Sequence, residues 1–183
     1  MNYCQEQGLD LIEKGYVRDD IAAFWRFWRK GEGRLTADIH AIVSKLTFCA
    51  GEAANSASPP YLFIGDKAYV TQCYGPNWSS GALANQGTTP DGDLERLAAE
   101  GYAQAMAGEA RFDLVSVCTE SELFGGKIEI AYERLILPLK TDTGHRLLGC
   151  MTAPIMPIKR VSGPDSADPW QNSIATSRPV LYA

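Results

Sequence analysis

Histidine, closely spaced cysteine and long apolar runs are scarce in this chain of 183 residues. It has two histidines, and its five cysteines stand far apart, at positions 4, 49, 73, 118 and 150. Zinc sites use closely spaced ligands and disulfide frameworks use cysteines in even numbers, so this pattern favours free thiols in a reducing compartment. No apolar run reaches the length of a membrane span, and the acidic first twenty residues lack the apolar core of a secretory signal. We therefore expect a cytoplasmic protein without a membrane partner.

Positive charge and nucleotide-binding motifs are lacking as well. The formal net charge is −5, which argues against nucleic acid as a main partner. Neither a phosphate-binding G-x-x-x-x-G-K-[ST] motif nor a G-x-G-x-x-G motif occurs, and no nucleophile elbow is present. The carboxylates at positions 91, 93 and 95 are interpreted as residues of a helix start, which the helix dipole favours, rather than as metal ligands. We therefore expect neither a metal site nor an enzyme.

Cofactor ligands are equally hard to find. His40 and His145 each lie beside a turn, so we interpret them as surface imidazoles rather than haem ligands. No flavin-attachment cysteine motif occurs, and Cys118 and Cys150 fall in predicted strands, where a free thiol behaves as a small apolar side chain. The sequence therefore predicts no cofactor and a colourless purified protein.

What the chain does have is an ordinary globular composition. Hydrophobic residues make up 45% and charged residues 21%, and 183 residues are enough for one hydrophobic core. We divide the chain into an N-terminal segment (1–18), one folded domain (19–157) and a polar C-terminal tail (158–183). Residues 51–60 and 75–92 are rich in small and turn-forming residues, which predicts loops.

The clearest predicted helix begins at Asp19 or Asp20 and ends at Gly31. Its apolar side chains recur at i, i+3, i+4 and i+7 and so share one face: Ile21, Phe24, Trp25 and Trp28. Phe27 lies towards the edge of that face and extends the aromatic surface beyond one stripe. Aromatic residues are enriched in interface cores. We therefore predict a homodimer interface formed by Phe24, Trp25, Phe27 and Trp28; the alternative is that all four lie in the chain's own core.

The second half of the chain predicts a helix and three antiparallel strands. The helix spans residues 93–107, and the strands span 112–119, 127–140 and 145–153, with a turn at 141–144. Two shorter strands are predicted at 46–49 and 61–65, and a short helix is favoured at 69–74.

The long strand at 127–140 changes phase along its length. Its first half is apolar at Ile128, Ile130 and Tyr132, whereas its second half is apolar at Leu135, Leu137 and Leu139. Side chains of a strand alternate between two faces, so the two sets cannot both face one core. A β-bulge near Glu133–Arg134 would rephase the strand. Burial of both faces, under a helix or a partner subunit, is the alternative.

This order of two strands, a helical middle and three closing strands resembles a PAS domain. The chain resembles a family of bacterial single-domain PAS-like proteins over roughly residues 20–155, and residues 76–92 depart from that pattern. The resemblance is carried by these segments: FWRFWRKGEGRL (24–35), ADI (37–39), YLFIG (61–65), CYG (73–75) and YERLILPLKTDTGHRLLG (132–149). It implies an α+β fold with a five-stranded antiparallel sheet, helices on one face and an aromatic flanking helix.

The resemblance also implies a sensory or regulatory module that signals through contacts with an unidentified protein partner. A ligand would lie between the sheet and the helical middle and would be small and largely apolar. The implied pocket residues are Trp78, Tyr102, Phe112, Leu114, Ile130, Tyr132 and Cys150. Two alternatives stay open: an interaction or dimerisation module with a filled core, and a small-molecule enzyme on a similar sheet.

Overall fold

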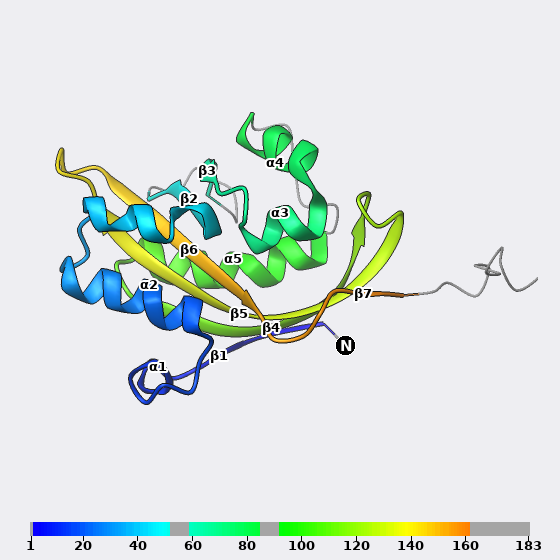
Figure 1. The fold of residues 1–183 in the computed structure, drawn as a ribbon, viewed down its shortest axis with the longest axis horizontal. Helices are drawn as coiled ribbons and strands as arrows, with labels where there is room; N and C mark the ends of the chain where they lie inside the picture. Colours follow the sequence, from blue (N-terminus) through cyan, green and yellow to red (C-terminus); the bar gives the residue numbers. More distant parts are fainter. Residues whose placement is uncertain (1, 52–58, 85–91, 162–183) are drawn as a thin grey trace, which may run out of the picture.

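A seven-stranded sheet runs through the computed structural model, which describes residues 2–51, 59–84 and 92–161 (Figure 1). The strands lie in the order β1-β4-β5-β6-β2-β3, with β7 paired to β5, and all of these pairs are antiparallel. The strands are β1 (Tyr3–Glu6), β2 (Leu46–Ala50), β3 (Tyr61–Ile64), β4 (Arg111–Ser121), β5 (Gly126–Lys140), β6 (Arg146–Pro154) and β7 (Lys159–Arg160). The helices are α1 (Asp10–Glu13), α2 (Asp19–Lys30), η1 (Ala37–Ala41), η2 (Val43–Lys45), α3 (Tyr69–Tyr74), α4 (Pro76–Leu83) and α5 (Gly92–Met106).

The expected α+β class with an antiparallel sheet is confirmed, but the expected number of five strands is wrong. Strand β1 adds to the free edge of β4, and the two-residue β7 adds to β5. The side chains of β1 are mostly exposed, so the segment has no alternating pattern that a sequence could reveal. The segment 1–18 is also not separate from the domain, because Ile12 of α1 is buried in the main core.

A helix stands where a loop was expected after Gly75. Helix α4 begins with Pro76 in its first turn, a position where proline's fixed φ and missing N–H cost nothing. The rest of the two predicted loops, at 52–58 and 85–91, and residues 162–183 of the predicted tail lie outside the described residues.

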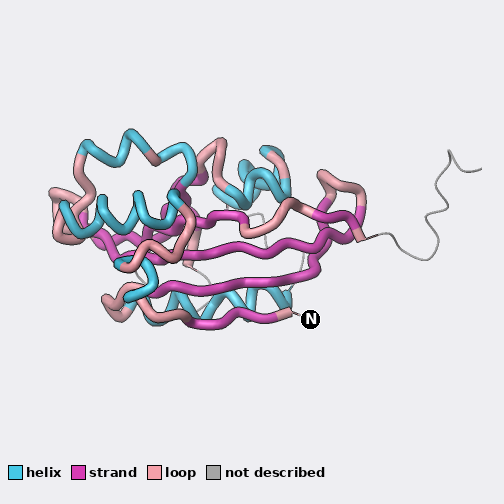
Figure 2. Tube along the Cα trace, turned by 60° about the horizontal axis from the view of Figure 1, so that its bottom comes forward, coloured by secondary structure: helices cyan, strands magenta, loops and turns pink. Residues whose placement is uncertain are grey.

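Helices cover both faces of the sheet, so the expectation of helices on one face is wrong (Figure 2). Helix α2 packs on one face, called here the α2 face, while α5 and α3 pack on the opposite one, the α5 face. Strand β5 alternates between these faces without a register shift against β4 or β6. The predicted bulge at Glu133–Arg134 is therefore wrong, and the alternative, burial of both faces, is confirmed.

The α2 face is closed by the aromatic helix. Phe24, Trp25 and Phe27 are buried there against β5 and β6, and Trp28 is half-buried. A β-carbon at Gly149 would lie 2.7 Å from Cζ of Phe24, so the ring occupies the space above a glycine of β6. Phe24, Trp25 and Phe27 are therefore taken up by the chain's own core, which was the alternative to the predicted interface, and the homodimer stays a prediction. Burial of one such ring contributes about 1.5–3 kcal/mol, which an apolar sheet face supplies without a partner.

Within the residues that the structure describes, no helix is both long and apolar enough to cross a membrane.

Candidate functional site

Two buried charges lie opposite each other on the α5 face. Asp113 of β4 and Arg134 of β5 are paired in register, and their side chains are 0% and 3% exposed. Nη2 and Nε of Arg134 donate to one carboxylate oxygen of Asp113 at 2.6 and 3.0 Å, while Nε of Arg111 donates to the other oxygen at 2.5 Å. A buried carboxylate is tolerated only when paired and hydrogen-bonded, and two guanidinium groups meet that condition here.

This ion pair continues outwards to strand β1 and helix α5. Nη1 of Arg111 donates to Glu6 in β1 and to Gln104 in α5, both at 2.7 Å. Nη2 of Arg134 also contacts the sulfur of Cys4 in β1 at 3.4 Å. The network therefore fastens the N-terminal strand and the helix to the same two central strands.

Gly101 brings helix α5 close to the network. A β-carbon at this position would lie 2.6 Å from Nη2 of Arg134 and 3.1 Å from an oxygen of Asp113. Because both groups are held by their mutual hydrogen bonds, they have little freedom to move aside. Only glycine lets the helix backbone approach this closely.

Next to the ion pair lies a group that we call the tyrosine–cysteine cluster, formed by Tyr61, Tyr102, Tyr132, Cys49 and Cys150. The guanidinium of Arg134 lies 5.7 Å from the centre of the Tyr102 ring, a cation–π distance. The Tyr102 hydroxyl is in hydrogen-bonding contact with the thiols of Cys49 and Cys150. The Cys150 thiol lies near all three tyrosine hydroxyls and near Arg134, which places it at the centre of the cluster.

The cluster is electrically neutral. Burial raises the pKa of the Cys49 and Cys150 thiols, although the contact with Tyr102 lowers both in part. Burial likewise raises the pKa of the Tyr61, Tyr102 and Tyr132 hydroxyls. The thiols are therefore protonated at neutral pH, which disfavours nucleophilic chemistry because the thiolate is the reactive form.

A buried tyrosine hydroxyl that lacks a hydrogen bond of normal geometry adjoins this cluster. Tyr69 of α3 is 4% exposed, and its ring meets that of Tyr132 edge-on at 5.6 Å between centroids. Its hydroxyl makes no hydrogen bond of normal geometry to any residue that the structure describes, and the nearby polar group is the Cys73 thiol, a weak hydrogen-bonding partner. Burial and the nearby Cys73 thiol raise the pKa of Tyr69, and burial raises that of Cys73 to about 12. Leaving a buried hydroxyl unsatisfied costs about 1–3 kcal/mol.

The structure brings together most of the predicted pocket residues and separates two. Tyr102, Tyr132 and Cys150 meet in the cluster, and Ile130 and Trp78 pack in the adjoining group around Tyr69. The other two predictions are wrong. Phe112 is buried in the core beneath α2, and Leu114, two residues on, shares its face, because the register turns Asp113 and Val115 towards α5 instead.

Sequence reasoning missed Tyr61, Tyr69, Cys49 and the Asp113–Arg134 pair. The sequence did carry a signal for the pair. Asp113 is an acidic residue inside one apolar predicted strand, and Arg134 is a basic residue inside the next one along the chain. A charge in such a strand needs a buried partner. The tyrosines carried no comparable signal, because a buried tyrosine and a pocket tyrosine have the same local pattern.

The remaining candidates lie outside any site. His40 and His145 are exposed, in agreement with their interpretation as surface imidazoles. Among the described residues, no group of three or more histidine, cysteine, aspartate or glutamate side chains could hold a metal ion. The side chains at 91, 93 and 95 lie outside the described part of the chain.

No family model, no curated protein and no solved structure matches this chain. The resemblance to a PAS-like family therefore stays a prediction, and the function rests on the geometry of the α5 face.

Proposed function

We propose that this chain is a PAS-like sensory or regulatory module that binds a small neutral molecule between the α5 face and the helices that cover it. The order of elements supports the proposal: strands β2 and β3, then helices α3 to α5, then three consecutive strands β4 to β6. Strands β1 and β7 add to this arrangement without interrupting it.

The observation that carries the proposal is the buried hydroxyl of Tyr69, which makes no hydrogen bond of normal geometry and has the weakly bonding Cys73 thiol as its polar neighbour. Proteins pair nearly all of their buried polar groups, so an orphaned hydroxyl beside other buried hydroxyls marks a place where something else supplies the partner. The neighbouring ring of Tyr132 connects this hydroxyl to the cluster around Cys150. A few convergent polar groups among apolar side chains are typical of small-molecule sites.

The chemistry of the surroundings defines the ligand class. The side chains that pack around Tyr69 are largely apolar, among them Val115, Ile128 and Ile130. The guanidinium of Arg134 is already neutralised by Asp113, and the thiols and phenols of the cluster are uncharged. A neutral, mostly apolar molecule with a hydrogen-bond acceptor, such as a carbonyl or ether oxygen, fits these conditions best.

The proposed output is a protein contact rather than a reaction. Protonated thiols and neutral phenols are poor nucleophiles and bases at neutral pH, so the cluster is suited to recognition. The network from Arg134 through Arg111 to Glu6 connects the site to strand β1 at the edge of the sheet. A signalling partner that contacts this edge would sense changes in the site.

Native mass spectrometry of the protein purified from its own host tests the proposal. We expect a bound small molecule in the wild type and its loss in Tyr69→Phe, which removes only the hydroxyl. Tyr16→Phe is the matched control. Tyr16 is 74% exposed, so this variant should retain the bound molecule. Circular dichroism of each variant shows that the fold is kept.

The absence of any bound molecule from the wild type, by native mass spectrometry and by solvent extraction, would contradict the proposal and favour an interaction module with a filled core. A bound molecule that absorbs visible light would overturn the expectation of a colourless protein without a cofactor.

A further inference from the structure

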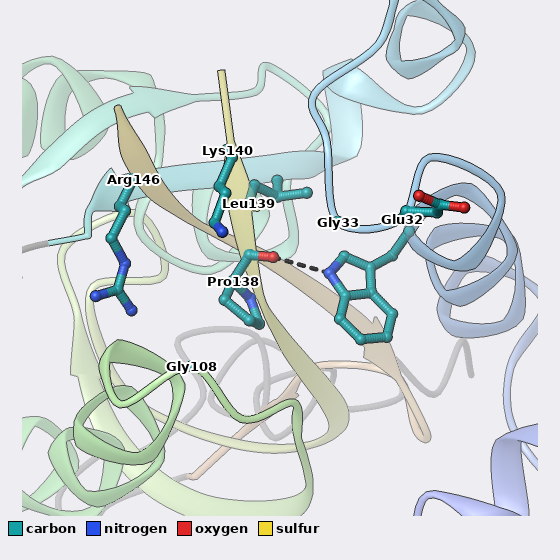
Figure 3. A pocket seen from close by; sticks show the side chains of 8 residues that line it. Glu32, Gly33, Gly108, Pro138, Leu139, Lys140 and Arg146 are labelled. Atoms are coloured by element: carbon teal, nitrogen blue, oxygen red, sulfur yellow. Dashed lines mark hydrogen bonds between the residues drawn. The ribbon is translucent and has the colours of Figure 1, made fainter. Parts of the chain in front are cut away.

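A surface cleft lies at the C-terminal end of β5 (Figure 3). Its lining has two basic side chains and one acidic side chain, whereas the chain as a whole is acidic. Its volume is about 340 Å³, and its walls include Trp28, Glu32, Gly108, Pro138, Lys140 and Arg146. It lies between the loop that follows α2 and the C-terminal end of α5. The cleft shares no residue with the tyrosine–cysteine cluster, so it is independent of the function proposed above.

One wall of the cleft is held rigidly by the loop after α2. The indole N–H of Trp28 donates to the carbonyl of Pro138 at 2.8 Å, and the ring stacks on Trp25 at 5.2 Å. Strand β4 pairs with β5 only as far as Ile136. Beyond that point the loop after α2 pairs with β5 in place of β4. The N–H of Lys140 donates to the carbonyl of Gly33 at 2.9 Å, and the N–H of Leu35 donates to the carbonyl of Lys140 at 2.8 Å. The indole and the proline ring thus form a fixed apolar surface.

The opposite side of the cleft carries two cations that lie side by side. Lys140 of β5 and Arg146 of β6 are direct partners in the register, so their side chains leave the same face of the sheet. Arg146 donates to the carbonyl of Met106 at 2.7 Å, and neither cation has a carboxylate partner among the described residues. Figure 3 shows the carboxylate of Glu32 turned away from both.

Like charges directly opposite each other on neighbouring strands are destabilising. An anion between them removes that repulsion and gains charge-assisted hydrogen bonds from both groups. We propose that this cleft binds a small organic anion in which a carboxylate or phosphate is attached to a flat apolar group. Lys140 and Arg146 hold the anionic group, and the flat group packs on the rings of Trp28 and Pro138.

Titration with 2-naphthoate, followed by ¹H–¹⁵N correlation spectra, tests this site. The indole N–H of Trp28 reports on the cleft directly, and Trp28→Phe assigns its peak. We expect a saturable shift of that peak with 2-naphthoate, and affinities weaker by about tenfold or more for 2-naphthamide, which lacks the charge, and for inorganic phosphate, which lacks the flat group. Equal shifts with 2-naphthamide, or with phosphate, would overturn the proposal.

Variants separate the two cations from general electrostatics. The pair Lys140→Gln and Arg146→Gln, made together, should weaken 2-naphthoate binding by about tenfold or more. Lys67→Gln is the control, because Lys67 is exposed and lies outside the cleft, and it should bind as the wild type does. Should the double variant fail to fold, Lys140→Gln alone carries the test. Unchanged binding in the variant that folds would overturn the proposal.

Discussion

The two faces of the sheet are built from the same strands and yet have opposite chemistry. On the α2 face, β5 presents Leu135, Leu137 and Leu139 to the aromatic helix. On the α5 face, the same strand presents Tyr132 and Arg134 to hydroxyls, thiols and a carboxylate. One side is an apolar layer apart from the buried carboxylate of Glu133, which accepts from the backbone N–H of Arg18 at 2.7 Å, and the other combines apolar side chains with a network of buried polar groups.

This difference indicates that the α2 face mainly stabilises the fold, whereas the α5 face is suited to recognition. Apolar burial is non-directional, so many side chains of suitable volume would close the α2 face. Polar groups in a low-dielectric interior cost free energy unless each finds a partner in the right geometry. The α5 face therefore depends on exact pairing, and its unpaired hydroxyl is a weakness that a ligand would remove.

The largest expected effect comes from breaking the ion pair on the α5 face. Asp113→Ala should lower the free energy of unfolding by about 3–5 kcal/mol, because it removes the carboxylate that pairs with Arg134 and Arg111 in the interior. Urea denaturation of the variant measures the loss.

The control is Glu129→Ala, which removes an ion pair with Lys159 at 3.5 Å between two largely exposed side chains. That change should cost less than about 1 kcal/mol, because solvent screens exposed charges. A loss as small as this in Asp113→Ala would mean that the α5 face does not depend on its charges.

A smaller effect is expected where α5 approaches the network. Alanine normally stabilises a helix interior by about 1 kcal/mol relative to glycine. Gly101→Ala should instead lower the free energy of unfolding by about 1–3 kcal/mol, because its β-carbon would lie 2.6 Å from Nη2 of Arg134.

Gly81→Ala in helix α4 provides the matched comparison, since a β-carbon there would meet no atom within 4 Å. It should raise the melting temperature, whereas Gly101→Ala should lower it. If both substitutions are stabilising, the close approach of α5 does not constrain the α5 face.

The smallest expected change in the free energy of unfolding comes from removing the Tyr69 hydroxyl, and its sign distinguishes a recognition site from a packed core. In ligand-free protein, Tyr69→Phe should raise the free energy of unfolding by about 1 kcal/mol, because it removes a buried hydroxyl that has no partner. Thermal unfolding of ligand-stripped samples measures the change, and Tyr16→Phe at an exposed position should show none. Destabilisation by Tyr69→Phe would indicate that the hydroxyl already contributes to the fold.

Much of this protein follows from local patterns in its sequence. The periodicity of Ile21, Phe24 and Trp25 was sufficient to locate α2, and alternation with intervening turns located the strands β2 to β6. Exposure of both histidines also followed, because each lies beside a turn. These features are local, since helix and strand periods act over a few residues and need no distant partner.

Other features were decided only by the tertiary structure. The sequence shows that β5 is apolar on both sides, but only packing decides that α2 covers one side and buries Phe27 with it. Strand β1 exists because β4 offers a free edge, and the register turns Asp113 rather than Phe112 towards α5. Pairing of strands distant in sequence brings Tyr61, Cys150 and Arg134 together. A one-residue change of register exchanges the two faces of a strand, so such a site arises only once the strands have paired.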